Sequence, residues 1–471
     1  MLTQPRYEAK RLRELGRAIR LERQLESHDR MHRTDIEALQ RRSLARLVRH
    51  AVDRSPLYRE HLAGVDLSGE ITLSELPTVT REELMDGFDG WVTDSRLTLT
   101  GVQAHLEALD RPDELYLGRY RAMTTGGSSG KKGVFIFDSH EWSVVLALTL
   151  RWSRLMGVGP RLPNRVRSAV VAAGNPMHIT YRVAVTADVG LAKILRLEAT
   201  TPIPELVDAL NDFQPEHLHA YPSIAALLAD EQEVGRLRIS PRVVSTSSEL
   251  RTEEMTERIR VAWRAEPFDC YGITEVGLFG NDCEYHRGIH AFDDLFIFEV
   301  VDEAGRPVAA GEAGYHLLVT NLFDYTQPLI RYEITDMIAV NPEPCPCGRP
   351  FPLIESIEGR SDDILYLSDG IGGEVPVHPM HFRSPMAAAR DVRQYQVVQR
   401  AESILLRIVL SDGANRDHTR RRLSAALDQK LRQAGAEPPT LEFEFVDAIE
   451  RDPQTMSKLK LVSSEVARPG D

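Results

Sequence analysis

Between about residues 120 and 340, short apolar runs alternate with amphipathic stretches, and this alternation restricts the fold of the 471-residue chain more than any other feature. Residues 166–174 and 241–250 are apolar runs that we predict to be strands. The segments TPIPELVDALNDF and SIAALLADEQEVG are predicted to be helices between strands. Such alternation favours a largely parallel sheet covered by helices on both faces, which is the α/β class.

The regions on either side have different patterns. Apolar residues recur at three- and four-residue spacing through residues 7–60, which predicts a helical N-terminal region. Residues 295–322 hold strand-like runs broken by DEAGRP and GEAG, which predicts hairpins. Beyond Arg360 the pattern is that of a small α+β unit. We therefore predict two domains, residues 1–360 and residues 361–471.

Composition excludes several classes of protein. Lys and Arg number 57 and Asp and Glu 70, and the resulting charge of −13 argues against non-specific nucleic-acid binding. No apolar run approaches the roughly 18–20 residues of a membrane helix, and the first residues are too charged for a signal peptide. Four cysteines do not make a disulfide framework in a chain of this length, so we expect a reducing, cytoplasmic location.

The stretch Met123–Gly133, MTTGGSSGKKG, leads directly into the strand-like VFIFD. Its glycines permit close approach to a ligand, its hydroxyls donate hydrogen bonds, and its lysines supply positive charge, a combination that suits a polyphosphate. The Walker A spacing is absent, because only three residues separate Gly126 from Gly130. G-x-S-x-G of serine hydrolases is present, but a strand and not a helix follows it. We favour a phosphate loop between two strands over a flexible surface turn.

Cysteine and histidine spacing gives an independent signal. Cys283 and His290 are separated by six residues, and Cys345 and Cys347 lie in a Gly- and Pro-containing loop. Three cysteines and one histidine are a ligand set for a closed tetrahedral Zn²⁺ site. His286 competes with His290 for the fourth position, and free buried thiols are the alternative to a metal. The fourth cysteine is assigned to the core.

Four further motifs follow in order: CYGITEVG (270–277), RYEITDM (331–337), EGRSDDIL (358–365) and MSKLKLV (456–462). Together with the Gly/Ser/Lys loop, they resemble the adenylate-forming superfamily, in particular its phenylacetate–CoA ligase-like branch. The resemblance extends from about Leu44 to Val462. It implies a large N-terminal domain with a small β-barrel-like subdomain and a small, mobile C-terminal domain. It also supports zinc, because this branch carries a similar Cys/His arrangement.

The resemblance implies specific roles in binding ATP. The β- and γ-phosphates would be held by Thr124, Thr125, Ser128, Ser129, Gly130 and Lys131. The adenine pocket would be formed by Tyr271, Gly272, Ser248 and Glu249, with an ordinary strand-end turn as the alternative for the last two. Thr274 would contact the α-phosphate, and Glu275 would bind Mg²⁺, a hard ion that prefers oxygen ligands. Asp336 would accept both ribose hydroxyls, and Arg360 would lie against the ribose and phosphate.

Lys458 aligns with the lysine of the superfamily that bridges the carboxylate and the α-phosphate during adenylation. A cation at this position offsets the repulsion between the two anions. The match is incomplete, because Ser457 precedes this lysine where the superfamily has glycine and Lys460 is an alternative. Asp362 or Asp363 would be the hinge between the domains. An exposed aspartate pair that caps a turn explains the same residues.

A second departure concerns the step after adenylation. In the ligases an Arg- and Gly-containing loop helps to guide pantetheine, whereas residues 366–379 here are glycine-rich and acidic and lack that arginine. We therefore expect ATP-dependent activation of a small carboxylic acid, with coenzyme A as the first candidate acceptor and a carrier protein, amine or hydroxyl as alternatives. A non-catalytic, zinc-stabilised nucleotide-binding protein is the third hypothesis. His178 is a candidate for the acid pocket, and the resemblance implies a homodimer.

Overall fold

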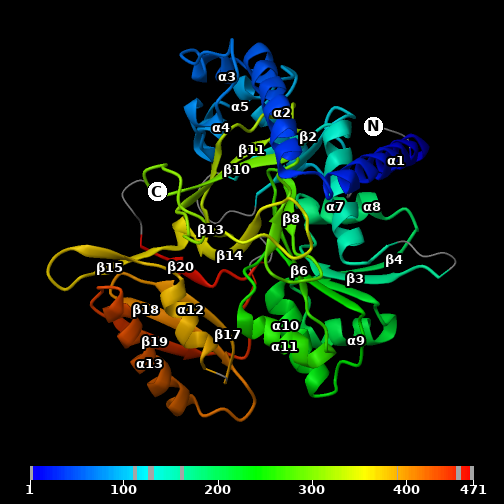
Figure 1. Ribbon diagram of the computed structural model, residues 1–471. Helices are drawn as coiled ribbons and strands as arrows, with labels where there is room; N and C mark the ends of the chain where they lie inside the picture. The colour runs from blue at the N-terminus through cyan, green and yellow to red at the C-terminus, as the bar shows by residue number, and fades with distance from the viewer. Residues whose placement is uncertain are drawn as a thin grey trace.

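The computed structural model describes residues 4–109, 114–125, 132–159, 164–389, 391–451 and 458–466. Its N-terminal region is helical, as the periodicity predicts, and α1 packs against α7 of the α/β region (Figure 1). Thr80 caps α4 through a reciprocal capping box with Glu83. The elements of this region are α1 (Gln4–His28), α2 (Arg33–Arg54), α3 (Pro56–His61), η1 (Leu73–Glu75), α4 (Arg81–Asp86), α5 (Phe88–Trp91) and α6 (Leu99–Glu107).

The largest sheet of the described residues has nine strands in the order β13-β14-β9-β8-β7-β6-β5-β3-β4. Neighbours from β4 to β7 are parallel, and neighbours from β7 to β13 are antiparallel. The strands are β3 (Arg167–Ala172), β4 (Lys193–Glu198), β5 (His217–Ala220), β6 (Val243–Ser247), β7 (Phe268–Ile273), β8 (Gly277–Asn281), β9 (Ile289–Ala291), β13 (Asp336–Asn341) and β14 (Leu353–Arg360). The alternation of strands and helices thus predicted the parallel half, and the α/β class is confirmed.

Helices cover this sheet through two separate hydrophobic cores. Apolar residues of α9, α10 and α11 pack on β3, β5 and β6, whereas α7 packs with residues of β7, β8 and β9. Burial on each face explains why the parallel strands are continuous apolar runs. The helices are α7 (Ser139–Leu155), α8 (Ile179–Ala187), α9 (Ile203–Phe213), α10 (Pro222–Glu233) and α11 (Glu253–Trp263).

Two smaller antiparallel sheets border the large one. One is the pair β1 (Arg121–Thr124) and β2 (Val134–Phe137), on either side of the Gly/Ser/Lys stretch. The other joins β10 (Phe296–Val301), β11 (His316–Asn321) and β12 (Tyr332–Ile334), and it contains the predicted hairpin. Among the described residues, this second sheet is open and has three strands.

Residues that follow Arg360 share a hydrophobic core of their own, and we call residues 361–466 the C-terminal unit. It lies below the large sheet in Figure 1, in yellow to red, and the β15–β16 hairpin projects from it. Its elements are η2 (Ser361–Asp363), β15 (Leu365–Ser368), β16 (Glu374–Val377), α12 (Met380–Ala387), β17 (Val392–Gln399), β18 (Ser403–Leu410), α13 (Arg416–Gln433), β19 (Thr440–Phe445) and β20 (Val462–Ser464). Among the described helices, none is both long and apolar enough to cross a bilayer.

Candidate active site

A cavity of about 860 Å³ lies between the large sheet and the C-terminal unit. Residues that end β6 and β7 form part of its wall, because parallel strands deliver their carboxyl ends to one edge of a sheet. Most of the predicted site residues that the structure describes reach this wall: Thr125, His178, Ser248, Glu249, Tyr271, Gly272, Thr274, Glu275, Asp336, Arg360 and Lys458. Thr125 and Lys458, whose motifs lie more than 300 residues apart in the sequence, therefore line the same cavity.

Asp336 is the centre of a hydrogen-bonded group in this wall. The Tyr271 hydroxyl donates to one of its carboxylate oxygens, and Arg360 Nε donates to the other at 2.9 Å. Asp336 and Arg360 are direct partners in the β13–β14 register, so the sheet itself brings them together. Burial and the neighbouring carboxylate raise the pKa of Tyr271 well above its ordinary value, so the phenol stays protonated and remains a donor.

Glu275 is a second buried carboxylate in the same wall. It follows Thr274 in the turn between β7 and β8, and it accepts a hydrogen bond of 3.3 Å from the Tyr332 hydroxyl. Burial raises its pKa, and the charge of Asp336 adds to that increase. A buried carboxylate favours a nearby cation, and the oxygen donors of Glu275 fit Mg²⁺, for which further ligands would have to come from phosphate and water.

Lys458 brings positive charge into the cavity from the C-terminal unit. Burial and the charge of Arg360 lower its pKa, whereas Asp336, Glu249 and Glu275 raise it, and the result is about 8. Its alternative, Lys460, forms an ion pair of 3.0 Å with Asp363. The structure therefore gives the two lysines different surroundings: the first lies among cavity carboxylates and the second is engaged by an aspartate of η2.

The turn after β6 has an unusual backbone at Ser248. Its φ is 72°, in the left-handed region that costs a non-glycine residue free energy. The next residue, Glu249, accepts hydrogen bonds from the Ser223 backbone N–H and hydroxyl at the start of α10. It also accepts from Arg451 Nη1 and from the Leu459 backbone N–H, each at 2.7 Å. The predicted adenine-pocket residue thus lines the cavity while its carboxylate joins the large sheet to the C-terminal unit.

The predicted phosphate loop is described only at its two ends. Thr125 Oγ1 accepts a hydrogen bond of 2.9 Å from the Gly133 N–H, and the Thr125 N–H donates to the Gly133 carbonyl at 2.9 Å. Thr124 precedes this closure in β1 and is buried. The ends of the segment therefore meet beside the cavity. The remaining predicted phosphate ligands, Ser128, Ser129, Gly130 and Lys131, lie outside the described residues.

Another part of the cavity wall is mostly uncharged. Val145, Thr149 and Trp152 of α7 line it together with Ile179 and Val183 of α8. His178 caps α8 by accepting from the Thr180 N–H at 3.3 Å, and burial lowers its pKa to about 3. His219 also lines the cavity, and burial lowers its pKa to about 4. Both imidazoles are therefore neutral near pH 7.

The polar contributors to this site that sequence reasoning missed include His219, Ser223 and Arg451. His219 had a recognisable signal, because HLHA places two histidines on the same face of an otherwise apolar strand. His217 Nε2 and His219 Nδ1 each contact Ser245 Oγ, at 2.8 and 3.0 Å. Neither Ser223 nor Arg451 belongs to a recognisable motif.

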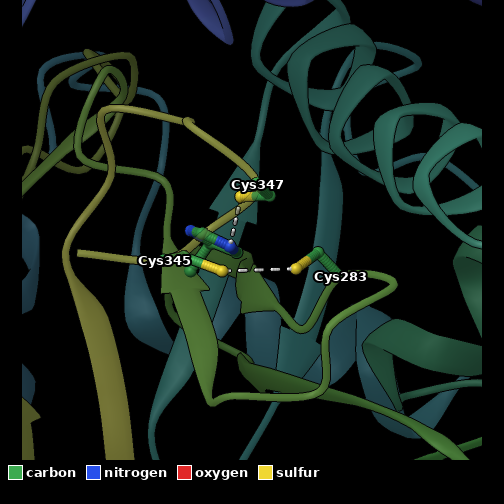
Figure 2. Close-up of side chains that lie close together, drawn as sticks. Cys283, Cys345 and Cys347 are labelled. Atoms are coloured by element: carbon green, nitrogen blue, oxygen red, sulfur yellow. Dashed lines mark hydrogen bonds between the residues drawn. The ribbon is translucent and has the colours of Figure 1, made fainter. Parts of the chain in front are cut away.

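The predicted Cys/His ligands form a compact cluster apart from the cavity. The donor atoms of Cys283, His290, Cys345 and Cys347 all lie within 4.8 Å of one another. Cys283 Sγ is 3.6 Å from Cys345 Sγ, and Cys347 Sγ is 3.3 Å from His290 Nε2; Figure 2 shows the three thiol groups turned toward a common point.

The strand register explains how this cluster assembles. His290 is paired with Leu353 in the β9–β14 register, and the loop that carries Cys345 and Cys347 leads into β14. Burial lowers the pKa of His290 to about 4, which leaves the neutral imidazole that a metal requires. His286 instead contacts Asp282 Oδ2 through Nδ1 at 2.8 Å. Of the two histidines, the structure places His290 with the thiols.

Comparisons with known proteins identify enzymes to which this chain is similar. No family model matches the chain. A phenylacetate–coenzyme A ligase of Thermus thermophilus is 27% identical over 391 residues, which cover 79% of this chain and 80% of that enzyme. The chain is a relative of phenylacetate–coenzyme A ligases. The resemblance predicted from the motifs is confirmed.

Solved structures of a 2-hydroxyisobutyryl-CoA ligase show the same fold at low sequence identity. In the postadenylation state with R3-HIB-AMP, the TM-score is 0.72, with 19% identity, 93% of this chain and 91% of that chain covered. In the thioesterification state with 2-HIB-AMP and CoA, coverage is 93% and 92% and identity 19%, but the TM-score falls to 0.58. The TM-score is therefore higher against the postadenylation structure, and both comparisons show a shared fold.

Proposed function

We propose that the protein is an AMP-forming acid–thiol ligase that activates a small carboxylic acid with ATP and transfers the acyl group to coenzyme A. The entry of Lys458 into a cavity walled by Tyr271, Glu275 and Asp336 carries this proposal. A single cavity then offers a cation, two carboxylates and an aromatic hydroxyl, the groups that binding of ATP and an acid demands. The relatives named as CoA ligases support the same activity.

The first step joins an oxygen of the acid's carboxylate to the α-phosphorus of ATP and breaks the bond to pyrophosphate. Asp336 would accept the ribose hydroxyls, with Arg360 beside it, and Tyr271 would lie against adenine. Lys458 would stabilise the charge that develops between the two anions. Thr274 would contact the α-phosphate, and Glu275 would hold Mg²⁺, which would neutralise phosphate charge when bound. These groups act by positioning and electrostatics.

In the second step a thiol sulfur attacks the acyl carbon, AMP leaves, and the thiol proton is released. We propose coenzyme A as the thiol, because the neighbouring ligase structure in the thioesterification state holds CoA. The segment 366–379, which lacks the arginine of the ligases, forms the β15–β16 hairpin with Ile371 91% exposed at its tip. The absence of that arginine favours the alternative, in which the acceptor is a carrier protein, an amine or a hydroxyl.

Three further properties belong to this proposal. Asp362 or Asp363 of η2 would be the hinge, because the separate core of the C-terminal unit begins just beyond these residues. The Cys/His cluster would hold a structural Zn²⁺, since its three thiols and one imidazole are the donors of a closed tetrahedral site. We also retain the expectation of a cytoplasmic homodimer.

A panel of carboxylic acids tests the proposal. Each acid would be incubated with the protein, ATP and Mg²⁺, and exchange of labelled pyrophosphate into ATP would be measured together with acyl-AMP by mass spectrometry. We expect exchange with at least one acid and conversion to a thioester when CoA is added. Exchange without a thioester would favour another acceptor. ATP binding without exchange for any acid would favour the non-catalytic hypothesis.

A further inference from the structure

One buried carboxylate joins the two parts of the molecule next to the cavity. Glu249 belongs to the turn after β6, and Arg451 belongs to the C-terminal unit. Their side chains are only 4% and 7% exposed, and Arg451 Nη1 lies 2.7 Å from Glu249 Oε1. Arg451 Nη2 also donates to the Ser223 hydroxyl. An ion pair so deeply buried is costly to break on one side, because the remaining charge is left without compensation.

The same carboxylate oxygen also contacts the residue next to Lys458. The Leu459 backbone N–H donates to Glu249 Oε1 at 2.7 Å, so Glu249 contacts the chain on both sides of this lysine, at Arg451 and at Leu459. The other carboxylate oxygen is fixed by the Ser223 N–H and hydroxyl at the first turn of α10. The acceptor is therefore anchored on rigid elements of the larger domain, and the donors belong to the segment that delivers the lysine.

We propose that Arg451 is a positioning residue for adenylation: its ion pair with Glu249 holds Lys458 in the cavity and must separate before the C-terminal unit can turn for thioester formation. This inference rests on the proposed function. Its physical basis is that the acceptor and the donors lie on different units. Any rotation that withdraws Lys458 also separates Arg451 and Leu459 from Glu249.

A second ion pair between the units helps to define what Arg451 does. Arg393 Nε lies 2.6 Å from Asp230 Oδ2, and Arg258 Nη1 donates to the Arg393 carbonyl at 3.0 Å. These contacts join β17 to α10 and α11 and involve no neighbour of Lys458. They stabilise the arrangement of the two units, whereas the Glu249 contacts fix the lysine-bearing segment itself.

The test uses the full-length protein and compares Arg451→Met with Arg451→Lys. Adenylation would be measured by pyrophosphate exchange, and acyl transfer by thioester formation from chemically prepared acyl-AMP and CoA. We expect Arg451→Met to slow exchange by about tenfold or more, because small displacements of a reacting group cost large factors in rate. Arg451→Lys should recover part of that loss. Acyl transfer should be undiminished in both variants.

Arg306→Met is the matched control. Arg306 forms an exposed ion pair with Asp302 at 2.7 Å in the loop between β10 and β11, and neither residue lines the cavity, so its loss should leave both half-reactions and the thermal unfolding midpoint unchanged. Equal slowing of both half-reactions in Arg451→Met, or full exchange activity in that variant, would overturn the positioning role. The rates of both half-reactions are measured at substrate concentrations that saturate the unmodified protein.

Hydrogen exchange of the peptide 458–466 separates this inference from the proposed function. The Leu459 amide donates directly to Glu249, so Arg451→Met should accelerate deuterium uptake in this peptide, and Arg306→Met should not. Unchanged uptake in Arg451→Met would overturn the inference even if the enzyme is active. An unmodified protein that exchanges pyrophosphate with no acid would overturn the proposed function, while the deuterium measurement would still report on the Glu249 contact.

Discussion

The large cavity and the Cys/His cluster both gather polar side chains from distant parts of the sequence, but they leave different space around them. The cavity has a volume of about 860 Å³, and its carboxylates include those of β13 and of the turns after β6 and β7. The cluster has all four donor atoms within 4.8 Å of one another. The first arrangement leaves room for a large anionic ligand, and the second leaves room for a single ion. We therefore interpret the closely packed donor atoms of the cluster as a structural metal site. We interpret the charged groups around the open cavity as a catalytic site.

Removal of two ligands from the cluster should have the largest effect on stability. We expect the unmodified protein to contain about one zinc ion per chain. Cys345→Ser with Cys347→Ser should lose the ion and about 4 kcal/mol of the free energy of unfolding, because loss of a structural metal is among the most destabilising changes. Elemental analysis and chemical denaturation measure the two quantities. The control variant Cys270→Ser should keep its zinc. If the unmodified protein contained no zinc, the interpretation of the Cys/His cluster as a zinc site would be wrong.

Replacement of the cavity's lysine should affect rate and not folding. Lys458→Ala is expected to slow pyrophosphate exchange by about 10²–10³-fold, the loss typical of one group that stabilises transition-state charge. The dissociation constant of ATP should change little, because this contribution is concentrated in the transition state. Lys460→Ala is the matched control, since that lysine contacts Asp363. If Lys460→Ala produced the larger loss of exchange, the assignment of the two lysines would be reversed.

Asp336→Asn tests the ribose contact. Removal of a charged acceptor should weaken ATP binding by about 1.5–3 kcal/mol, measured by calorimetry. Tyr271→Phe removes only the hydroxyl that donates to Asp336 and should have a smaller effect. Equal affinity for ATP in Asp336→Asn and the unmodified protein would contradict the proposed placement of the ribose. Neither variant should lose zinc, because none of the four cluster residues lines the cavity.

The smallest expected effect is a pH dependence. Lys458 is charged below its pKa of about 8 and neutral above it, and the proposed chemistry needs the charged form. The value of kcat/KM for ATP should therefore be level below pH 8 and should fall as the pH rises above it, by about tenfold per pH unit. Lys458→Arg should be slower but should lack this fall, because the guanidinium stays charged. A fall of the same size and midpoint in Lys458→Arg would assign the titration to another group.

Local patterns predicted the elements better than they predicted the contacts between them. The helices predicted within residues 7–60 and the strand that became β6 both depend on residues a few positions apart, so the local sequence contains the information needed. Lys458 and Lys460 both line the cavity, and the choice between them depends on which carboxylates from distant elements surround each side chain. The ion pair of Glu249 and Arg451 spans 202 residues, and Arg451 belongs to no recognisable motif.

The ion pair of Lys460 with Asp363 has a mechanical consequence. Asp363 stands where the C-terminal unit begins, Lys460 precedes its strand β20, and β20 is paired in parallel with β17. If the unit turns about Ser361–Asp363 as proposed, these contacts would carry Lys460 and β20 with it, and Lys458 would leave the cavity in the same movement. A single molecule would then serve only one half-reaction at a time, and its turnover would alternate between two mutually exclusive arrangements.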